Sequence, residues 1–333
     1  MRHMPFSLRR PMQRLVMAYA FSLPMLYTSH ANAKDEYPNH PIRLIIGFSA
    51  GGTTDIMGRA AATEMSKELG QPVVVENRTG AAGSVMAAAT IAAPPDGYTV
   101  CVCGSGPQVL LPLIDKAAEN YPRDLAPVGM LYKTGYILIG RSTIKADTAQ
   151  ELIANIKAHP GKFTYGSSGV GGIQHLGMEM LADELKSPMV HVPYKGEQPA
   201  AVDIAAGQVD LMMATPTTAQ SMIKLGKVKA YASTGDKPNA LFPNLPTLQS
   251  LGYPDLLVHT FAGLNVTKDT PPEVITKLSA AAAVAVKSDD FKQRAEEAGM
   301  TIPPSGPQAY AEFVSDEIKR WTPVTKKLNF QRQ

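Results

Sequence analysis

The sequence has few of the residues that build disulfide, redox or metal sites. Only two cysteines and one tryptophan occur among its 333 residues. Cys101 and Cys103 lie two apart in a predicted strand, which puts them on one face at about 6.5–7 Å, too far apart for an easy disulfide. We therefore expect two small buried thiols, with a redox pair as the alternative. Without clustered histidines they make a poor metal site, so we expect no metal and no cofactor.

Long apolar runs are also scarce, and the longest falls short of the ~20 residues that a membrane-spanning helix needs. This run, residues 15–28, is broken by Pro24 and is followed by the small residues of "ANA", 31–33. The residues before and around it are basic: Arg2, Arg9, Arg10 and Arg14. Such an order is typical of a secretory signal peptide. We expect residues 1–33 to be cleaved after Ala33 and the protein to reach the periplasm, with an uncleaved anchor as the alternative.

Charge is modest and nearly balanced. Charged residues make up 18% of the chain and apolar residues 44%, a composition typical of a packed globular protein. Without the four arginines of the signal segment, 28 basic side chains face 29 acidic ones. A nearly neutral body gives no electrostatic reason to expect nucleic acid or an anionic membrane as a partner.

Several nucleotide and catalytic motifs are missing. The sequence has no GxxxxGK[ST], which argues against nucleoside triphosphates. The first predicted strand–helix turn has no GxGxxG, and Gln174 stands where a last glycine would complete this spacing in the second. Val170 occupies the closing position of a GxSxG around Ser168, so the nucleophile elbow is also absent.

Strand and helix patterns alternate along the rest of the chain. The patterns predict strands at 42–48, 72–77, 98–104, 136–140, 163–167, 189–194, 209–215, 228–234 and 257–266. They predict helices at 55–69, 84–93, 148–158, 173–185, 199–207, 218–226, 271–287, 289–298 and 307–328, with Trp321 in the core. This alternation predicts an α/β fold with mostly parallel sheets flanked by helices.

Two predicted strand–helix junctions are rich in glycine. They are "FSAGGTTD", residues 48–55, and "YGSSGVGGIQH", residues 165–175. The first amides of a helix have no internal partner and carry a partial positive charge, so such junctions bind anions. Neither loop contains an arginine. The pattern indicates a small carboxylate held by backbone amides and hydroxyls, although tight helix–strand packing alone also explains such turns.

Seven segments occur in the order found in one protein family. They are "PIRLIIGFSAGGTTD", "GQPVVVENRTGAAGSV", "APPDGYTV", "YGSSGVGGIQH", "HVPYKGEQPA", "GQVDLMM" and "LPTLQSLGYP". In these segments the chain resembles the Bug family, the periplasmic solute-binding proteins of tripartite tricarboxylate transporters, a group that includes TctC. The resemblance extends over about residues 38–328. It implies a two-lobe type II periplasmic binding protein fold that closes on a small carboxylate, with membrane transporter subunits as partners and the binding protein itself a monomer.

The resemblance also implies a domain division and a site. Lobe 1 would comprise residues 34–138 plus 258–333, and lobe 2 residues 139–257. The ligand-binding residues carried over from the family motifs are Phe48, Ser49, Ala50, Gly51, Gly52, Thr53, Asp55, Ser105, Ser167, Ser168, Gly169, Val170, Gly171, His175, Ala214, Thr215 and Phe261. Ala50 stands where the family usually has proline, and Phe261 where tryptophan is common. Because these are cleft positions, the carboxylate could be a dicarboxylate, a tricarboxylate or an aromatic acid.

Several of these residues have a structural alternative. Asp55 fits helix N-terminal stabilisation as well as ligand contact, and His175 fits an internal hydrogen bond as well as donation to a carboxylate. Lys195 is a counter-charge or a solvated surface lysine. Phe48 and Phe261 stack on an aromatic acid or simply pack.

Two other functions remain open at this stage. An exported serine hydrolase would use Ser167 or Ser168 with His175, but no third orienting group is evident. The ligand-binding component of a sensor system would have the same fold, and the sequence does not separate it from a transport protein.

Overall fold

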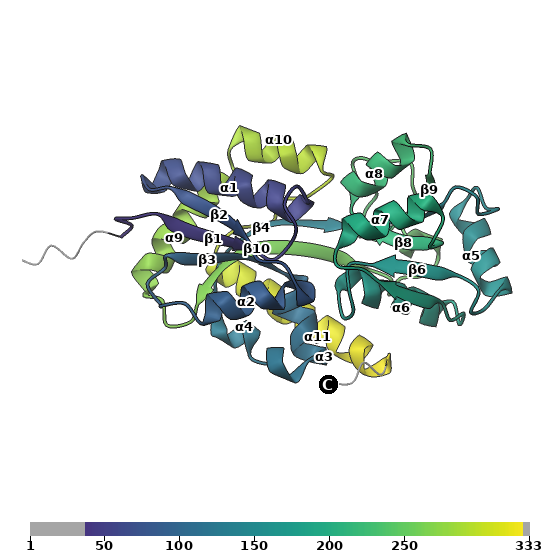
Figure 1. Cartoon of the computed structure of the whole chain (residues 1–333), viewed down its shortest axis with the longest axis horizontal. Helices are drawn as coiled ribbons and strands as arrows, with labels where there is room; N and C mark the ends of the chain where they lie inside the picture. The colour runs from purple at the N-terminus through teal and green to yellow at the C-terminus, as the bar shows by residue number, and fades with distance from the viewer. Residues whose placement is uncertain (1–36, 329–333) are drawn as a thin grey trace, which may run out of the picture. The chain divides into compact units, whose positions relative to one another are not determined.

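Two five-stranded sheets organise the computed structural model, which describes residues 37–328 (Figure 1). The predicted signal peptide, residues 1–33, lies outside the described residues. The first sheet has the order β2-β1-β3-β10-β4. Its strands are β1 (Ile42–Ile46), β2 (Val73–Asn77), β3 (Thr99–Gly104), β4 (Leu125–Gly135) and β10 (His259–Thr267).

The second sheet repeats this arrangement with the order β7-β6-β8-β5-β9. Its strands are β5 (Ile137–Arg141), β6 (Thr164–Ser167), β7 (Val190–Pro193), β8 (Leu211–Ala214) and β9 (Val228–Ser233). In the first sheet β1 pairs in parallel with β2 and β3, and in the second β6 pairs in parallel with β7 and β8. β10 and β5 run antiparallel to both of their neighbours, so each sheet is mixed.

Helices cover both faces of each sheet, which confirms the predicted α/β class. They are α1 (Thr53–Leu69), α2 (Ser84–Ile91), α3 (Leu111–Ile114), α4 (Tyr121–Asp124), α5 (Ala149–Ala158), α6 (Ile173–Glu184), α7 (Glu197–Ala206), α8 (Pro216–Lys224), α9 (Pro272–Ala285), α10 (Asp289–Glu297) and α11 (Pro307–Lys327). Shorter turns of 3₁₀-helix lie at η1 (Ala81–Gly83), η3 (Lys116–Ala118) and η4 (Gln249–Leu251), and a π-helical turn lies at η2 (Gly106–Leu110).

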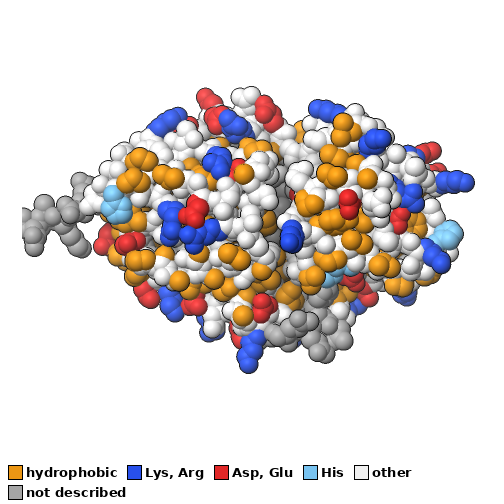
Figure 2. All heavy atoms as spheres, viewed as in Figure 1, with side chains coloured by type: hydrophobic (Ala, Val, Ile, Leu, Met, Phe, Trp, Pro, Cys, Tyr) orange, Lys and Arg blue, Asp and Glu red, His pale blue; other side chains and the backbone are white. Residues whose placement is uncertain are grey.

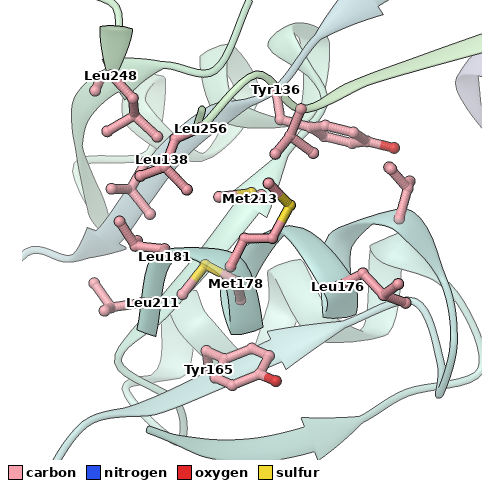
Figure 3. Close-up of a cluster of buried hydrophobic side chains, with 14 of the residues drawn as sticks. Tyr136, Leu138, Tyr165, Leu176, Met178, Leu181, Leu211, Met213, Leu248 and Leu256 are labelled. Atoms are coloured by element: carbon pink, nitrogen blue, oxygen red, sulfur yellow. The ribbon is translucent and has the colours of Figure 1, made fainter. Parts of the chain in front are cut away.

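Successive side chains of a strand point to opposite faces of the sheet, so each one packs against the helices on one face only. In β5, Ile137 and Ile139 pack with α7 and α8, whereas Leu138 packs with α5 and α6 on the other face. Met212 and Met213 of β8 divide in the same way, and Figure 3 shows the layer that contains Leu138 and Met213. Strands buried on both faces are continuously apolar, and this accounts for the unbroken hydrophobic runs in the sequence.

The chain crosses between the sheets through two paired segments. Tyr136 separates β4 from β5, and its backbone N–H donates to Thr234 Oγ1 at 2.8 Å. The Thr234 N–H donates to the Tyr136 carbonyl at 2.9 Å, and the Val258 N–H donates to the Thr234 carbonyl at 3.0 Å. A Cβ on Gly135 would lie 2.7 Å from the Gly235 nitrogen, so the two crossing segments can approach this closely only with glycine there.

Helix α11 provides a third connection. Val314 and Trp321 belong to the same buried cluster as Leu176 of α6, and Trp321 is fully buried, as predicted. Near the end of α11, Lys327 Nζ lies 2.5 Å from Asp183 Oδ2 of α6. The helix therefore packs against both sheet layers on the side where the chain crosses.

The predicted elements are largely confirmed, but one strand, β4, and the short helices α3 and α4 were not predicted. Strand β4 contains Pro127 and Gly129, which interrupt its apolar pattern. Because β4 is an edge strand, a proline can replace a ladder N–H there at little cost. The register shift between Leu264 and Asn265, which pairs with Pro127, also accommodates it.

The two cysteines are buried free thiols, as predicted. Cys101 Sγ and Cys103 Sγ lie 3.3 Å apart inside the first sheet, and burial raises the pKa of Cys103. Within residues 37–328 no group of His, Cys, Asp and Glu is arranged to hold a metal ion. None of the helices described is both long and apolar enough to cross a bilayer. Acidic and basic side chains are interspersed over the face shown in Figure 2.

Candidate ligand-binding cleft

A cleft of about 620 Å³ lies where loops from both sheets face each other. The parallel strands β1, β3, β6, β7 and β8 all deliver their following loops to it, as expected for ligand sites in α/β sheets. The lining residues are Gly47, Phe48, Ser49, Thr53, Thr54, Thr79, Gly80, Ala81, Ala82, Gly83, Val102, Gly104, Ser105, Gly106, Tyr132, Tyr136, Ser168, Gly169, Val170, Gly172, Ile173, Gln174, Tyr194, Lys195, Gly196, Glu197, Gln198, Pro199, Thr215, Thr260, Phe261 and Ala262.

The first glycine-rich loop is closed by its own helix. The Gly51 N–H donates to Asp55 Oδ2 at 2.9 Å, and the Gly52 N–H donates to the Ser49 carbonyl at 3.2 Å. Asp55 is 3% exposed and also accepts from Arg59 Nε at 2.9 Å and from Asn77 Nδ2 at 2.8 Å. Burial raises the pKa of Asp55, but the hydrogen bonds from Arg59, Asn77 and Gly51 outweigh it and lower the pKa below the usual range.

The second loop repeats this geometry. The Gly171 N–H donates to His175 Nδ1 at 3.0 Å, and the Gly172 N–H donates to the Gly169 carbonyl at 3.3 Å. Gly51 and Gly171 have φ of 77° and 74°, in the left-handed region that favours glycine. The glycines that follow them cap α1 and α6 with nearly identical extended dihedrals. Each loop thus uses the side chain four residues ahead to fix a glycine amide.

Hydroxyl groups line the side of the cleft that belongs to the first sheet. Thr54 Oγ1 lies 3.1 Å from the Tyr132 hydroxyl, and Ser105 Oγ lies 3.1 Å from Thr260 Oγ1. Burial raises the pKa of Tyr132 to about 12, so this hydroxyl is neutral and can donate at neutral pH. Across the cleft, Thr53 Oγ1 and Thr217 Oγ1 are 3.3 Å apart, which joins the start of α1 to the start of α8.

The sequence-predicted site residues fall into two groups. Those that line the cleft are Phe48, Ser49, Thr53, Ser105, Ser168, Gly169, Val170, Thr215 and Phe261. Those that lie outside its lining are Ala50, Gly51, Gly52, Asp55, Ser167, Gly171, His175 and Ala214. Within the second group, Asp55 and His175 shape the loops through internal hydrogen bonds, since each accepts from a backbone amide of its own loop.

Ser167 is placed as a structural residue. It has no exposed surface, and its Oγ lies 2.6 Å from His191 Nε2. His175 stacks on His191 with ring centroids 3.7 Å apart. Burial lowers the pKa of both rings to about 4, so both are neutral near pH 7. A buried serine paired with His191 rather than His175 gives no support to a hydrolase built on Ser167 and His175.

Sequence reasoning missed a third loop and several polar residues. Residues 79–83, which lead into and include η1, line the cleft. Ala81 and Ala82 there have φ of 44° and 51°, a conformation that is rare for alanine. The signal available was the pair of glycines in "TGAAG". Polar lining residues outside the predicted set include Thr54, Tyr132, Tyr136, Gln174, Tyr194, Glu197, Gln198 and Thr260.

Known proteins resemble this chain over most of its length. The family model described as "Tripartite tricarboxylate transporter family receptor", TctC, matches residues 57–330. A UPF0065 protein of Cupriavidus necator is 36% identical over 300 residues, which cover 90% of each chain. Protein BugT of Bordetella pertussis is 32% identical over 295 residues, 88% of this chain and 90% of its relative.

Solved structures agree with this fold. The periplasmic binding protein BugD superposes with a TM-score of 0.83 at 31% identity, covering 89% of this chain and all of that one. Rpa4515 of R. palustris, solved with adipate, has a TM-score of 0.83 at 27% identity over 89% of this chain and 100% of its own. MatC of Rhodopseudomonas palustris, solved with malate, has a TM-score of 0.80 at 29% identity over 86% of this chain and 99% of its own. The expected two-lobe periplasmic binding protein fold is confirmed.

Proposed function

This chain belongs to the TctC family of tripartite tricarboxylate transporter receptors, and from that premise we propose that it captures a small carboxylate in the cleft between its two sheets and delivers it to the membrane subunits of such a transporter. The observation that carries the proposal is the pair of matched glycine-rich loops, 48–55 and 165–175, which start α1 and α6 on opposite sheets and border one cleft of about 620 Å³.

The electrostatics of the cleft fit an organic acid. Each helix start carries a partial positive charge because its first amides lack internal partners. Lys195 adds a full positive charge at the cleft, and the hydroxyls of Thr53, Ser105 and Ser168 can donate to carboxylate oxygens. Adipate and malate in the two related structures are both small dicarboxylates, so this ligand class has precedent at comparable sequence identity.

We propose that residues 34–138 plus 258–333 form one lobe, residues 139–257 the other, and that they close by a hinge motion. The paired crossing segments at Tyr136, Thr234 and Val258 are where such a hinge would lie. We further propose that residues 1–33 direct export to the periplasm and that the mature protein acts as a monomer.

Calorimetric titration of the mature chain with mono-, di- and tricarboxylates tests this function. At least one acid should bind, and at 100 times its dissociation constant it should raise the free energy of unfolding by about 2.7 kcal/mol. Lys195→Met should weaken that binding, because the cleft loses its positive side chain. Lys237→Met is the matched control, because Lys237 is exposed and does not line the cleft. If no carboxylate binds, or if both lysine variants bind like the parent, the proposal is wrong.

A further inference from the structure

One acidic side chain, Glu197, lines a cleft whose other features favour anions. Its position affects which organic acids the cleft can bind. Glu197 is the first residue of α7, in the loop that follows β7. Resting on the function proposed above, we propose that Glu197 excludes a second carboxylate, so that the preferred ligand is a monocarboxylate whose other end is an amide or an ammonium group. The ligand's carboxylate would then lie at the glycine-rich loops, and its donor end at Glu197.

The carboxyl group of Glu197 already occupies an anion-binding position. Its Oε1 accepts from the Thr215 backbone N–H at 2.6 Å and from Thr215 Oγ1 at 3.0 Å. Thr215 is the N-cap of α8, so a protein carboxylate takes the donors that the start of this helix would otherwise offer to a ligand. Of the helix starts that face the cleft, α8 therefore has its N-cap amide taken by an acid that lines the cleft. The acid in the first turn of α1, Asp55, accepts from Gly51 outside the cleft lining, and α6 has no acid in its first turn.

The charge of Glu197 acts on two tyrosines that line the cleft. After burial, it contributes to raising the pKa of Tyr132 in β4 of the first sheet and of Tyr136 in the segment that crosses between the sheets. Burial raises the pKa of Glu197 above its usual range, because the opposing hydrogen bonds from Thr215 and Thr218 offset only part of the effect. Within residues 37–328, the charged residues that line the cleft are Lys195 and Glu197, so this lining carries one charge of each sign.

A balanced lining favours a ligand that is itself charged once or zwitterionic. A second carboxylate near Glu197 would place like charges together in a desolvated space, which is costly. An amide N–H or an ammonium there would instead donate to the carboxylate, which has room for about four hydrogen bonds. Helix capping alone would also explain the bonds to Thr215, but it predicts no effect of Glu197 on which ligand is preferred.

Titration calorimetry on ligands of matched length separates these explanations. The probes are succinate, succinamate and 4-aminobutyrate, and the longer set adipate, adipamate and 6-aminohexanoate, at about pH 8 so that carboxylates are ionised. The parent should bind a monoamide or amino acid at least about tenfold more tightly than the dicarboxylate of the same length. Glu197→Gln keeps an oxygen that can accept from Thr215 but removes the charge, so this ratio should fall to about threefold or less.

Glu296→Gln is the matched control, because Glu296 is exposed on α10 and does not line the cleft. It should keep the ratio of the parent. Glu197→Ala serves as the second charge-removing variant, and thermal melts show which variants are folded. Equal or tighter dicarboxylate binding by the parent, or an unchanged ratio in the folded Glu197 variants, overturns the inference but leaves carboxylate binding intact. If no probe and no other carboxylate binds the parent, the proposed function fails, and the inference fails with it.

Discussion

The backbone N–H of Gly51 donates to Asp55 Oδ2 at 2.9 Å, and so the first loop of the cleft is fixed by its own helix. His175 does the same for Gly171 in the second loop. These glycine amides are therefore satisfied within the protein. What each loop can offer a ligand is the start of the helix behind it and the polar groups that the fixed loop holds in place.

Replacing Asp55 with alanine should destabilise the fold and, through the loop, weaken ligand binding. The substitution leaves the Gly51 amide and the Asn77 amide without their buried acceptor, and removing one member of such a network costs about 2–4 kcal/mol. Urea denaturation measures this loss, and calorimetry on the folded variant measures the loss of affinity.

Asp290→Ala is the matched control for this variant. Asp290 also pairs with an arginine four residues ahead in a helix, at 2.8 Å, but it is exposed. Its loss should cost at most about 0.5 kcal/mol. Equal losses for Asp55→Ala and Asp290→Ala would show that Asp55 does not organise the first loop.

The two loop glycines should differ in their tolerance of alanine. A Cβ on Gly51 meets nothing within 4 Å, so Gly51→Ala should cost only the left-handed backbone strain, about 1–2 kcal/mol. A Cβ on Gly171 would also lie 2.3 Å from Ile114 Cδ1, so the end of this half-buried side chain must move and the substitution costs somewhat more than the backbone strain alone. Denaturation curves of both variants check the order. A larger loss for Gly51→Ala would contradict the described loop geometry.

Stability should fall as the pH drops from about 6.5 to about 4. His175 and His191 have pKa values lowered to about 4 by burial, with the charge of His191 adding to the effect at His175. In that window the unfolded chain binds protons that the native state does not, so protonation favours unfolding. Each histidine contributes a slope of at most about 1.4 kcal/mol per pH unit. Urea denaturation across this range measures the slope.

A histidine variant identifies the source of that slope. His191→Gln keeps a partner for Ser167 Oγ but does not titrate, so the dependence between about pH 6 and 4 should become shallower. Glu317 has its pKa lowered to about 2, because its interactions with His259, at 3.3 Å, and with Arg320 outweigh burial, and so its stabilising effect is lost only at lower pH. An unchanged slope in His191→Gln would rule out the histidine pair as its cause.

Thr53 and Thr217 should be coupled in ligand binding. Their hydroxyls lie 3.3 Å apart across the cleft, so this contact favours the arrangement in which α1 and α8 face each other closely. Replacing either threonine with valine should lower the affinity for the ligand by about two- to fivefold. The double variant should have an affinity only slightly lower than that of either single variant. Thr63→Val, whose exposed hydroxyl bonds within α1, is the control. Fully additive losses in the double variant would contradict the contact.

Local sequence signals predicted most elements and the two main loops. A glycine pair between an apolar strand and a helix predicts a strand–helix junction whatever its surroundings, and residues 48–55 and 165–175 both behave in this way. Strand β4 was missed because Pro127 is acceptable only at a sheet edge, a property of the tertiary structure.

The missing part of the cleft depends on contacts between distant segments. Glu197 meets Thr215 from the next strand–helix junction, and Tyr132 meets Thr54 across 78 positions. Neither pairing has a spacing that sequence periodicity could reveal. The sequence suggested His175 as the partner of Ser167, whereas the structure gives His191. This pairing could not be predicted either, because His191 is brought beside Ser167 only by the pairing of β6 with β7 in the sheet.

The most direct measurement is a crystal structure of the mature protein with the tightest carboxylate found by calorimetry. The account predicts one ligand carboxylate in the cleft, within about 2.7–3.2 Å of donors from both glycine-rich loops, at the starts of α1 and α6. A ligand bound outside this cleft, or held by the residues of one sheet alone, would contradict it.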